Sequence, residues 1–186
     1  MWDQISEPNN EELRRKLSEI VATFTRRQVG EQIPRIAELK KTYRHSISLV
    51  REAVAGRPET FKYNCVQYAP GLVNPPREVV QVARRYEHIF PSPNFMAHLA
   101  SSHLLELPEP QDGSIIVYWE DEEVRHAGKV EAPLVISKWG EFHLWRHRIY
   151  EVPITYGSIV RFFEAINAED ATRLFLEYVE KELGAR

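Results

Sequence analysis

Residues 61–69 read Phe61-Lys62-Tyr63-Asn64-Cys65-Val66-Gln67-Tyr68-Ala69 and contain the single cysteine of the chain. An extended polar and aromatic run leads into Cys65, and a short helix-compatible turn follows it. A thiol at a helix N-terminus is where a thiolate is stabilised, because free backbone N–H groups and the helix dipole favour negative charge. The stretch therefore predicts a nucleophile if a base lies nearby. The alternative is that Cys65 is a small buried hydrophobic residue, the commoner role of a lone cysteine.

The composition is that of an ordinary globular domain and argues against several classes of partner. The chain has 186 residues, 43% hydrophobic and 27% charged, with a net charge of −3. It has no long basic block, so we expect no nucleic-acid partner. One cysteine excludes an internal disulfide and any multi-cysteine metal site. No apolar run has the length of a membrane span or the form of a signal peptide, so we expect no membrane partner. These features predict a cytoplasmic protein, or one exported without a cleaved signal peptide.

The N-terminal segment, residues 1–57, is predicted to be a helical hairpin. Apolar residues recur at helical spacing over residues 9–29 and again over residues 34–55, and Gly30 and Gly56 mark the two ends. Two such helices joined by a short turn pack antiparallel. The hairpin is interpreted as a structural layer on the rest of the chain, with a partner-binding arm as the alternative.

The middle segment, residues 58–157, changes from helical to strand periodicity. Pro70 and Gly71 cut the cysteine helix short, and helices are predicted near residues 76–89 and 94–105. Residues 114–119, 125–130, 134–139 and 142–150 are rich in β-branched and aromatic residues and are separated by short turns. Such short connections predict a four-stranded antiparallel sheet. Residues 158–166 and 169–183, within a third segment of residues 158–186, are predicted to be helices packed on this core. The fold class is therefore α+β.

His126 is the predicted base for Cys65. It lies on the second predicted strand, directly before the small residues Ala127 and Gly128, which would let the cysteine helix approach closely. A histidine that takes a proton needs a polar partner to hold its tautomer. Ser137 on the next strand can accept a hydrogen bond from the imidazole. Lys138 cannot, because its ammonium group only donates.

The seven histidines raise the possibility of a metal site, which the spacing disfavours. His98 and His103 are five residues apart, whereas two ligands on one helix face are four apart. His143 and His147 are even steps along one strand and share a face, so a site there stays an alternative. Residues 120–123 are acidic but lack the alternating ligands of a calcium loop. We expect no metal and no other cofactor.

Three segments together resemble the NlpC-type branch of the papain-like cysteine peptidases. They are Tyr63-Asn64-Cys65, residues 112–118 (Asp-Gly-Ser-Ile-Ile-Val-Tyr) and residues 126–130 (His-Ala-Gly-Lys-Val). Residues 135–140, Arg146-His147 and residues 152–157 also look like a poorly characterised bacterial subgroup of that superfamily. The resemblance covers residues 61–157, in which Asn64 stands where the family often has Asp.

The resemblance implies a papain-like fold and cleavage of an amide bond, in a peptide or isopeptide substrate, with cell-wall peptides as one substrate class. Cys65 would attack, His126 would act as base, and a polar residue on the next strand would orient it. Ser137 is favoured for that role, with His147 as the rival. Tyr63 would help form an oxyanion site with the Cys65 backbone N–H. The substrate would lie among Tyr63, Asn64, Lys138, Trp139 and His147.

Two other functions stay open at this point. A catalytically silent relative would serve as a binding or immunity-type module, holding a protein partner in the cleft or on the helical hairpin. A thiol acyltransferase would use the same cysteine and histidine to pass an acyl group to an acceptor other than water.

Overall fold

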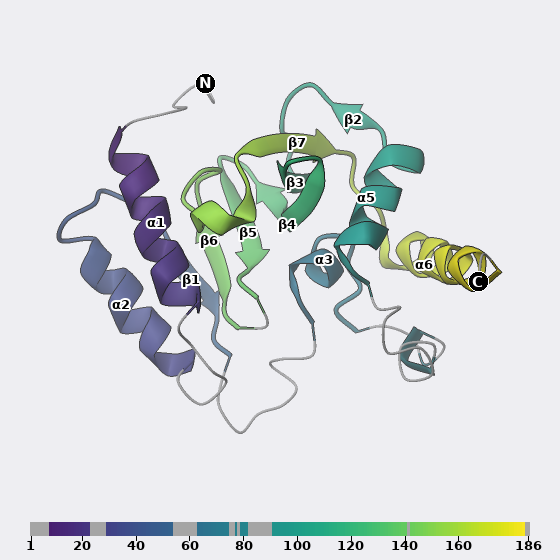
Figure 1. The fold of residues 1–186 in the computed structure, drawn as a ribbon, viewed down its shortest axis with the longest axis horizontal. Coiled ribbons are helices and arrows are strands. Elements are labelled where there is room, and N and C mark those ends of the chain that lie inside the picture. The colour runs from purple at the N-terminus through teal and green to yellow at the C-terminus, as the bar shows by residue number, and fades with distance from the viewer. Residues whose placement is uncertain are drawn as a thin grey trace.

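A seven-stranded antiparallel sheet forms the centre of the computed structural model (Figure 1). The structure describes residues 8–22, 29–53, 63–74, 77, 79–81, 91–140 and 142–184. The strand order is β1-β6-β5-β4-β3-β7-β2. In chain order the strands are β1 Ser48–Arg51, β2 Glu106–Leu107, β3 Ile115–Glu120, β4 Glu123–Glu131, β5 Leu134–Lys138, β6 Leu144–His147 and β7 Ile159–Phe163. The α+β class predicted from the sequence is confirmed.

The four predicted strands are β3, β4, β5 and β6, and each pairs antiparallel with the next. Their connections are too short to cross over the sheet, which leaves antiparallel pairing with the neighbour as the only arrangement. The predicted meander is therefore confirmed, but the sheet is wider than four strands. The two added neighbours of the meander, β1 and β7, come from the segments predicted as flanking helices.

The prediction of a helix over residues 158–166 is wrong, because this segment contains strand β7. Ile159-Val160-Arg161-Phe162-Phe163 consists mostly of β-branched and aromatic residues, which fit a pleated and half-buried surface. The strand pairs with β3 over its whole length, from Trp119 opposite Ile159 to Ile115 opposite Phe163. Pairing with the buried strand β3 therefore determines the conformation of this segment, and the weak helical spacing of its apolar residues does not.

The prediction of a second helix over residues 34–55 is correct only for residues 34–39 and wrong for the described residues that follow. Helix α2 spans Gln32–Leu39, and Lys40 caps it. The chain then turns into β1, which pairs with β6 at the edge of the sheet. The buried carboxylate of Glu151 accepts hydrogen bonds from the backbone N–H of Ser46 at 2.9 and 3.0 Å, which fixes the extended entry to β1. Residues 54 and 55 lie outside the described residues.

The other helices follow the sequence prediction more closely. The helical elements are α1 Pro8–Ala22, η1 Val29–Glu31, α2, α3 Cys65–Tyr68, α5 Pro93–Ser102, η3 Ile154–Tyr156 and α6 Ala168–Gly184. Helices α1 and α2 pack against each other, as the predicted hairpin requires. The predicted helix over residues 76–89 falls mostly outside the described residues.

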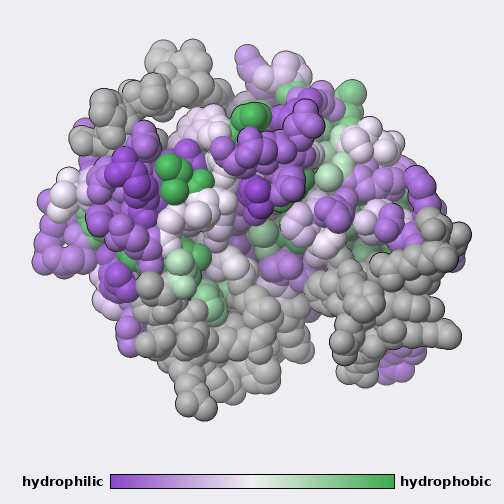
Figure 2. Space-filling view, in the orientation of Figure 1, coloured by the Kyte–Doolittle hydropathy of each residue, from purple (hydrophilic) through white to green (hydrophobic). Residues whose placement is uncertain are grey.

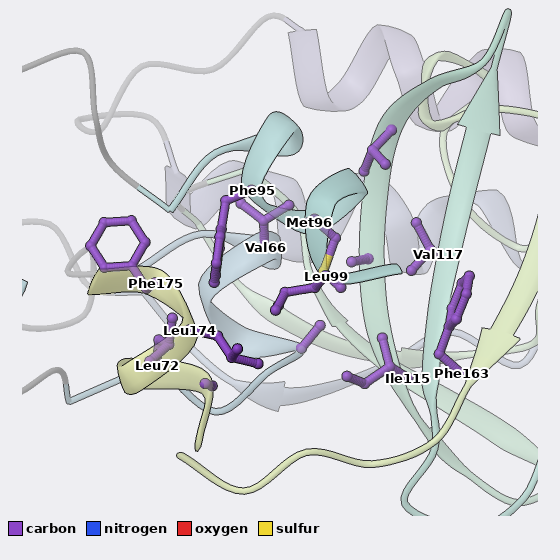
Figure 3. Packing of buried hydrophobic residues seen from close by; sticks show 14 of the residues in the cluster. Val66, Leu72, Phe95, Met96, Leu99, Ile115, Val117, Phe163, Leu174 and Phe175 are labelled. Atoms are coloured by element: carbon purple, nitrogen blue, oxygen red, sulfur yellow. The ribbon is translucent and has the colours of Figure 1, made fainter. Parts of the chain in front are cut away.

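The two faces of the sheet bury separate hydrophobic clusters. Along β3, Ile115 and Val117 enter one cluster while Ile116 and Tyr118 enter the other, as the period of two along a strand requires. The first cluster is closed by α3, α5 and α6, and Figure 3 shows their side chains converging on β3 and β7. The second cluster is closed by α1 and α2. We call these the α3 face and the α1 face.

The described surface exposes few large apolar side chains. Those that are exposed are Leu49, Val50, Leu105 and Ile159. In the coloured part of the face seen in Figure 2, hydrophobic residues are scattered among hydrophilic ones. None of the helices in the described ranges combines the length and apolarity needed to cross a bilayer.

Gly128 on β4 is predicted to tolerate no side chain. A Cβ atom there would lie 2.8 Å from the carbonyl oxygen of Ile136 and 3.0 Å from Cβ of Ser137, both on β5. Gly128→Ala should therefore lower the free energy of unfolding by about 1–3 kcal/mol, because β4 and β5 must separate. Urea denaturation measures this change. The control is Gly30→Ala, where no atom lies within 4 Å of the added methyl group. Equal stability of the two variants would contradict the packing described.

Candidate functional site

Cys65 is the first residue of α3, as the sequence predicts. Asn64 precedes it in an extended conformation, and its side chain accepts a hydrogen bond from the N–H of Gln67 at 3.1 Å. The Gln67 side chain accepts one from the N–H of Asn64 at 3.0 Å, so the two residues form a reciprocal capping box. The structure thus gives Asn64 a capping role, and its predicted contact with substrate stays a prediction.

Cys65 as a residue is half-buried, and its helix α3 packs against the central strand β4. The backbone N–H groups of Ala127, Val66 and Cys65 itself favour its thiolate, but burial outweighs them and raises the pKa of the thiol to about 11. The predicted donors are therefore present, while the predicted net stabilisation of the thiolate is not. At neutral pH Cys65 is a thiol.

His126 is completely buried on the α1 face. Its ring stacks on Tyr156 with centroids 4.0 Å apart and planes 17° apart, and Tyr118 packs at 5.5 Å. Neither Nδ1 nor Nε2 has a hydrogen-bond partner among the described residues. Burial, helped by the nearby His147, lowers the pKa of His126 well below 6.5. The imidazole is therefore neutral at pH 7 and keeps a free lone pair.

Cys65 and His126 meet the same strand from opposite faces. Ala127, whose N–H faces the sulfur, belongs to the cluster on the α3 face. Successive side chains of a strand point to opposite faces, so His126 points to the α1 face. No hydrogen bond joins the two groups in this structure. Ala127 admits the cysteine helix, as predicted, whereas the missing side chain of Gly128 makes room for β5.

Tyr156 connects the two groups and was not predicted as a site residue. Besides stacking on His126, its phenol is close enough to Cys65 for a thiolate there to raise the pKa of Tyr156, which burial already places well above 10. The backbone amide of Gly140 lies near the phenol, but the hydroxyl makes no hydrogen bond of normal geometry. Tyr156 lies in residues 152–157, one of the segments on which the family resemblance rests. That membership was the one feature of the sequence that could have identified Tyr156 as a site residue.

Arg14 of α1 holds the turn that carries Tyr156. Its Nε donates to the carbonyl oxygen of Val152 at 3.3 Å, and its Nη2 donates to that of Gly157 at 2.5 Å. These two residues flank η3 on either side. Arg14 as a residue is only 8% exposed, and both hydrogen bonds are buried. The first helix therefore fixes the position of Tyr156 over His126.

Ser137 binds His147 rather than His126. Its hydroxyl lies 2.8 Å from Nε2 of His147, whose Nδ1 lies 2.7 Å from the carbonyl oxygen of Arg148. Because Nδ1 must donate to that carbonyl, Nε2 accepts from the Ser137 hydroxyl. Trp139 Nε1–H in turn donates to the Ser137 oxygen at 3.1 Å. The Arg148 carbonyl thus fixes the tautomer of His147, and Ser137 donates to its Nε2. Ser137 is therefore hydrogen-bonded to His147, the predicted rival for the orienting role, and not to His126, which it was predicted to orient.

The remaining predicted contacts with substrate are buried residues. Trp139 is fully buried among Trp145, His147 and Tyr156. Lys138 is also buried, and its Nζ lies 4.1 Å from the centre of the Tyr63 ring in a cation–π contact. This contact accounts for the packing of Tyr63 and Lys138 near α3.

His143 and His147 do not form the alternative metal site. His143 Nδ1 accepts from the N–H of Ala53 at 2.9 Å, and its Nε2 donates to the carbonyl oxygen of Val29 at 2.8 Å. Both nitrogens of each histidine are therefore engaged by protein groups. Among the described residues, no three or more His, Cys, Asp or Glu side chains are grouped so as to hold a metal ion.

No protein-family model, curated protein or solved structure matches this chain. The chemistry of the site itself therefore carries the functional proposal.

The buried imidazoles predict a loss of stability in acid. Burial lowers the pKa of His147 from 6.5 to about 4 and that of His126 well below 6.5. Between about pH 4 and 6.5 the unfolded chain therefore binds more protons than the folded chain, and stability falls as the pH falls through this range. His147 alone should cost roughly 3 kcal/mol by pH 4.

Urea denaturation at pH 7.5 and at pH 4.5 measures this loss, and NMR titration of the histidine resonances assigns it. The control is His147→Gln, which should remove part of the pH dependence while keeping a group that bonds Ser137. Titration of His147 near pH 6.5 in the folded protein would contradict the burial described.

Proposed function

We propose that this protein is a cysteine hydrolase that cleaves an amide bond in a peptide or isopeptide substrate. Cys65 is the nucleophile and His126 is its general base. The fold is proposed to be a divergent NlpC-type papain-like domain. In support, Cys65 opens a helix that packs on a central antiparallel sheet, and His126 lies on the second strand of the meander that follows it.

One observation carries the proposal: the buried ionisable groups around Cys65 have unpartnered polar atoms. They are both nitrogens of His126 and the hydroxyl of Tyr156, and the side-chain nitrogen of Gln67 on the same short helix is also unpartnered. A buried polar atom without a hydrogen bond costs about 1–3 kcal/mol, and native proteins keep few of them. These are four of the eight such atoms among the described residues; the other four belong to Gln32, Trp119 and Trp145. We infer that the four near the single cysteine serve chemistry, because two of them belong to one imidazole that could act as a base.

The reaction proceeds through a thioester. His126 takes the proton from the Cys65 thiol as the sulfur attacks the carbonyl carbon, and the N–H of Cys65 at the helix start binds the developing oxyanion. The C–N bond then breaks, and the departing amine takes the proton back from the imidazolium. Water attacks the thioester while His126 takes its proton, which releases the acid and the thiol. An amine or hydroxyl acceptor in place of water would make the same site an acyltransferase.

The neutral thiol and neutral imidazole are the protonation states from which this reaction starts. An imidazole nitrogen must reach the sulfur, but Cys65 packs against the α3 face and His126 points to the α1 face. The reaction therefore requires His126 to leave its stack on Tyr156 and the adjoining part of β4 to shift relative to α3. The lack of hydrogen bonds at His126 lowers the cost of leaving the stack.

A second candidate is a catalytically silent binding module. Two observations favour it: burial raises the pKa of the Cys65 thiol to about 11, and no hydrogen bond joins Cys65 to His126. Such a module would hold a protein partner at the surface near Cys65 or at α1 and α2, and Cys65 would serve only as a packed side chain.

Alkylation of Cys65 by iodoacetamide distinguishes the two functions. For a hydrolase we expect a reaction that persists at pH 7, well below the thiol pKa of about 11, and that falls at least tenfold in His126→Phe. Mass spectrometry measures the rate between pH 6 and 10, and Cys65→Ala identifies the labelled residue. His147→Gln is the matched control and should react at the wild-type rate.

If the protein is a catalytically silent module, the rate of Cys65 alkylation should follow only the titration of the thiol and should not depend on His126. That result would overturn the hydrolase proposal. If the hydrolase is correct, Cys65→Ala also abolishes cleavage of any peptide found in a substrate screen while leaving urea stability nearly unchanged.

A further inference from the structure

Two histidines outside the proposed active site bring their ring nitrogens together at the end of α5. Nε2 of His98 and Nε2 of His103 lie 3.2 Å apart, with ring centroids 4.9 Å apart and planes at 70°. Both residues contact solvent: His98 is half-buried and His103 is exposed. In this structure the two nitrogens share a proton in a hydrogen bond, and a metal ion could take the place of that proton.

The two rings meet because helix α5 ends next to His103. A spacing of five residues on a continuous helix would have kept them apart. Helix α5 ends at Ser102, and His103 follows with φ −133° and ψ −19°. This departure from helical geometry turns the His103 ring back over the last turn, so the five-residue separation no longer keeps the rings apart. The ring of Tyr178 on α6 packs against His98 with centroids 5.2 Å apart and so restrains its orientation.

The geometry of the pair fits a shared ion. Zinc binds histidine nitrogen at about 2.0–2.1 Å in tetrahedral sites, which places two such nitrogens roughly 3.3 Å apart. Rings that both direct a nitrogen at one ion then have centroids roughly 5.2 Å apart, and a linear N–H···N bond of the observed length would place them roughly 5.5 Å apart. The observed centroid distance is 4.9 Å, so the two rings converge, and without an ion the same approach makes a bent N–H···N hydrogen bond.

We propose that His98 and His103 form a two-histidine site for a divalent transition-metal ion of the zinc type, with water at the remaining positions. Imidazole nitrogen suits zinc, copper and nickel, while calcium and magnesium prefer oxygen ligands. The nearby charges of Lys181 and Glu182 on α6 oppose each other. Two protein ligands make a weaker site than the three or four of catalytic and structural zinc sites. This site does not depend on the proposed hydrolase function.

Isothermal titration of the tag-free full chain with zinc chloride at pH 7.5 tests the site. We expect one equivalent to bind with a dissociation constant between about 1 µM and 1 mM. His98→Ala and His103→Ala should each weaken binding at least tenfold. Lowering the pH to 5.5 should weaken it further, because protonated imidazole cannot bind a metal. Magnesium chloride should give no signal.

Two control variants test other origins of the signal. Cys65→Ser removes the thiol, the strongest other zinc ligand in the chain, and His45→Ala removes a histidine far from α5 in sequence. Both should bind zinc as the wild type does. Absence of saturable binding up to about 1 mM would overturn the proposal, as would binding that survives in both His98→Ala and His103→Ala or is lost in Cys65→Ser.

Discussion

The burial of His126 without a hydrogen-bond partner is the constraint on which the rest of the site depends. The ring lies between Tyr118 of β3 and Tyr156 of η3, and water does not reach it. Removing a neutral imidazole from water without replacing its hydrogen bonds costs free energy that the surrounding packing must supply. The aromatic stack supplies part of it, and the fixed position of η3 preserves the stack. If stability alone determined the residue at position 126, an apolar side chain would fill this space better than an imidazole.

The N-terminal helices are part of the framework of the site. Arg14 reaches across from α1 to the two carbonyl oxygens that flank η3, and Tyr156 on that turn covers His126. The chain thus connects its first helix to the central strand through one buried cation and one aromatic stack. A partner that moved α1 would therefore also move Tyr156, which links the hairpin suggested by the sequence to the chemistry near Cys65.

Local signals in the sequence were sufficient for some elements and not for others. The meander from β3 to β6 could be predicted because strand-like composition and short turns agree there. Strands β1 and β7 could not, because Ile47, Val50 and Val160 fit helical as well as strand spacing and only the paired neighbour decides. The helix start at Cys65 was predicted from its position, and the capping box of Asn64 and Gln67 carries a recognisable signature.

The partners of side chains were harder to predict than the elements. Ser137 and His126 occupy neighbouring strands, as expected, yet Ser137 bonds His147, because the register places Ser137 and Trp145 opposite each other and His147 two residues further along β6. The thiol pKa was predicted in the wrong direction because the degree of burial around Cys65 depends on tertiary packing, which no local pattern specifies. His98 and His103 likewise met only because α5 ends between them.

The free energy of unfolding of His126→Phe tests the central claim most directly. The claim is that His126 is kept for chemistry at a cost in stability, so an aromatic ring without nitrogens should suit the site better. Urea denaturation at pH 7.5 should show a variant at least as stable as the wild type, by up to about 1–3 kcal/mol. A variant destabilised by more than about 2 kcal/mol, with an unchanged dependence on urea concentration, would show that the imidazole stabilises the fold and would contradict the claim.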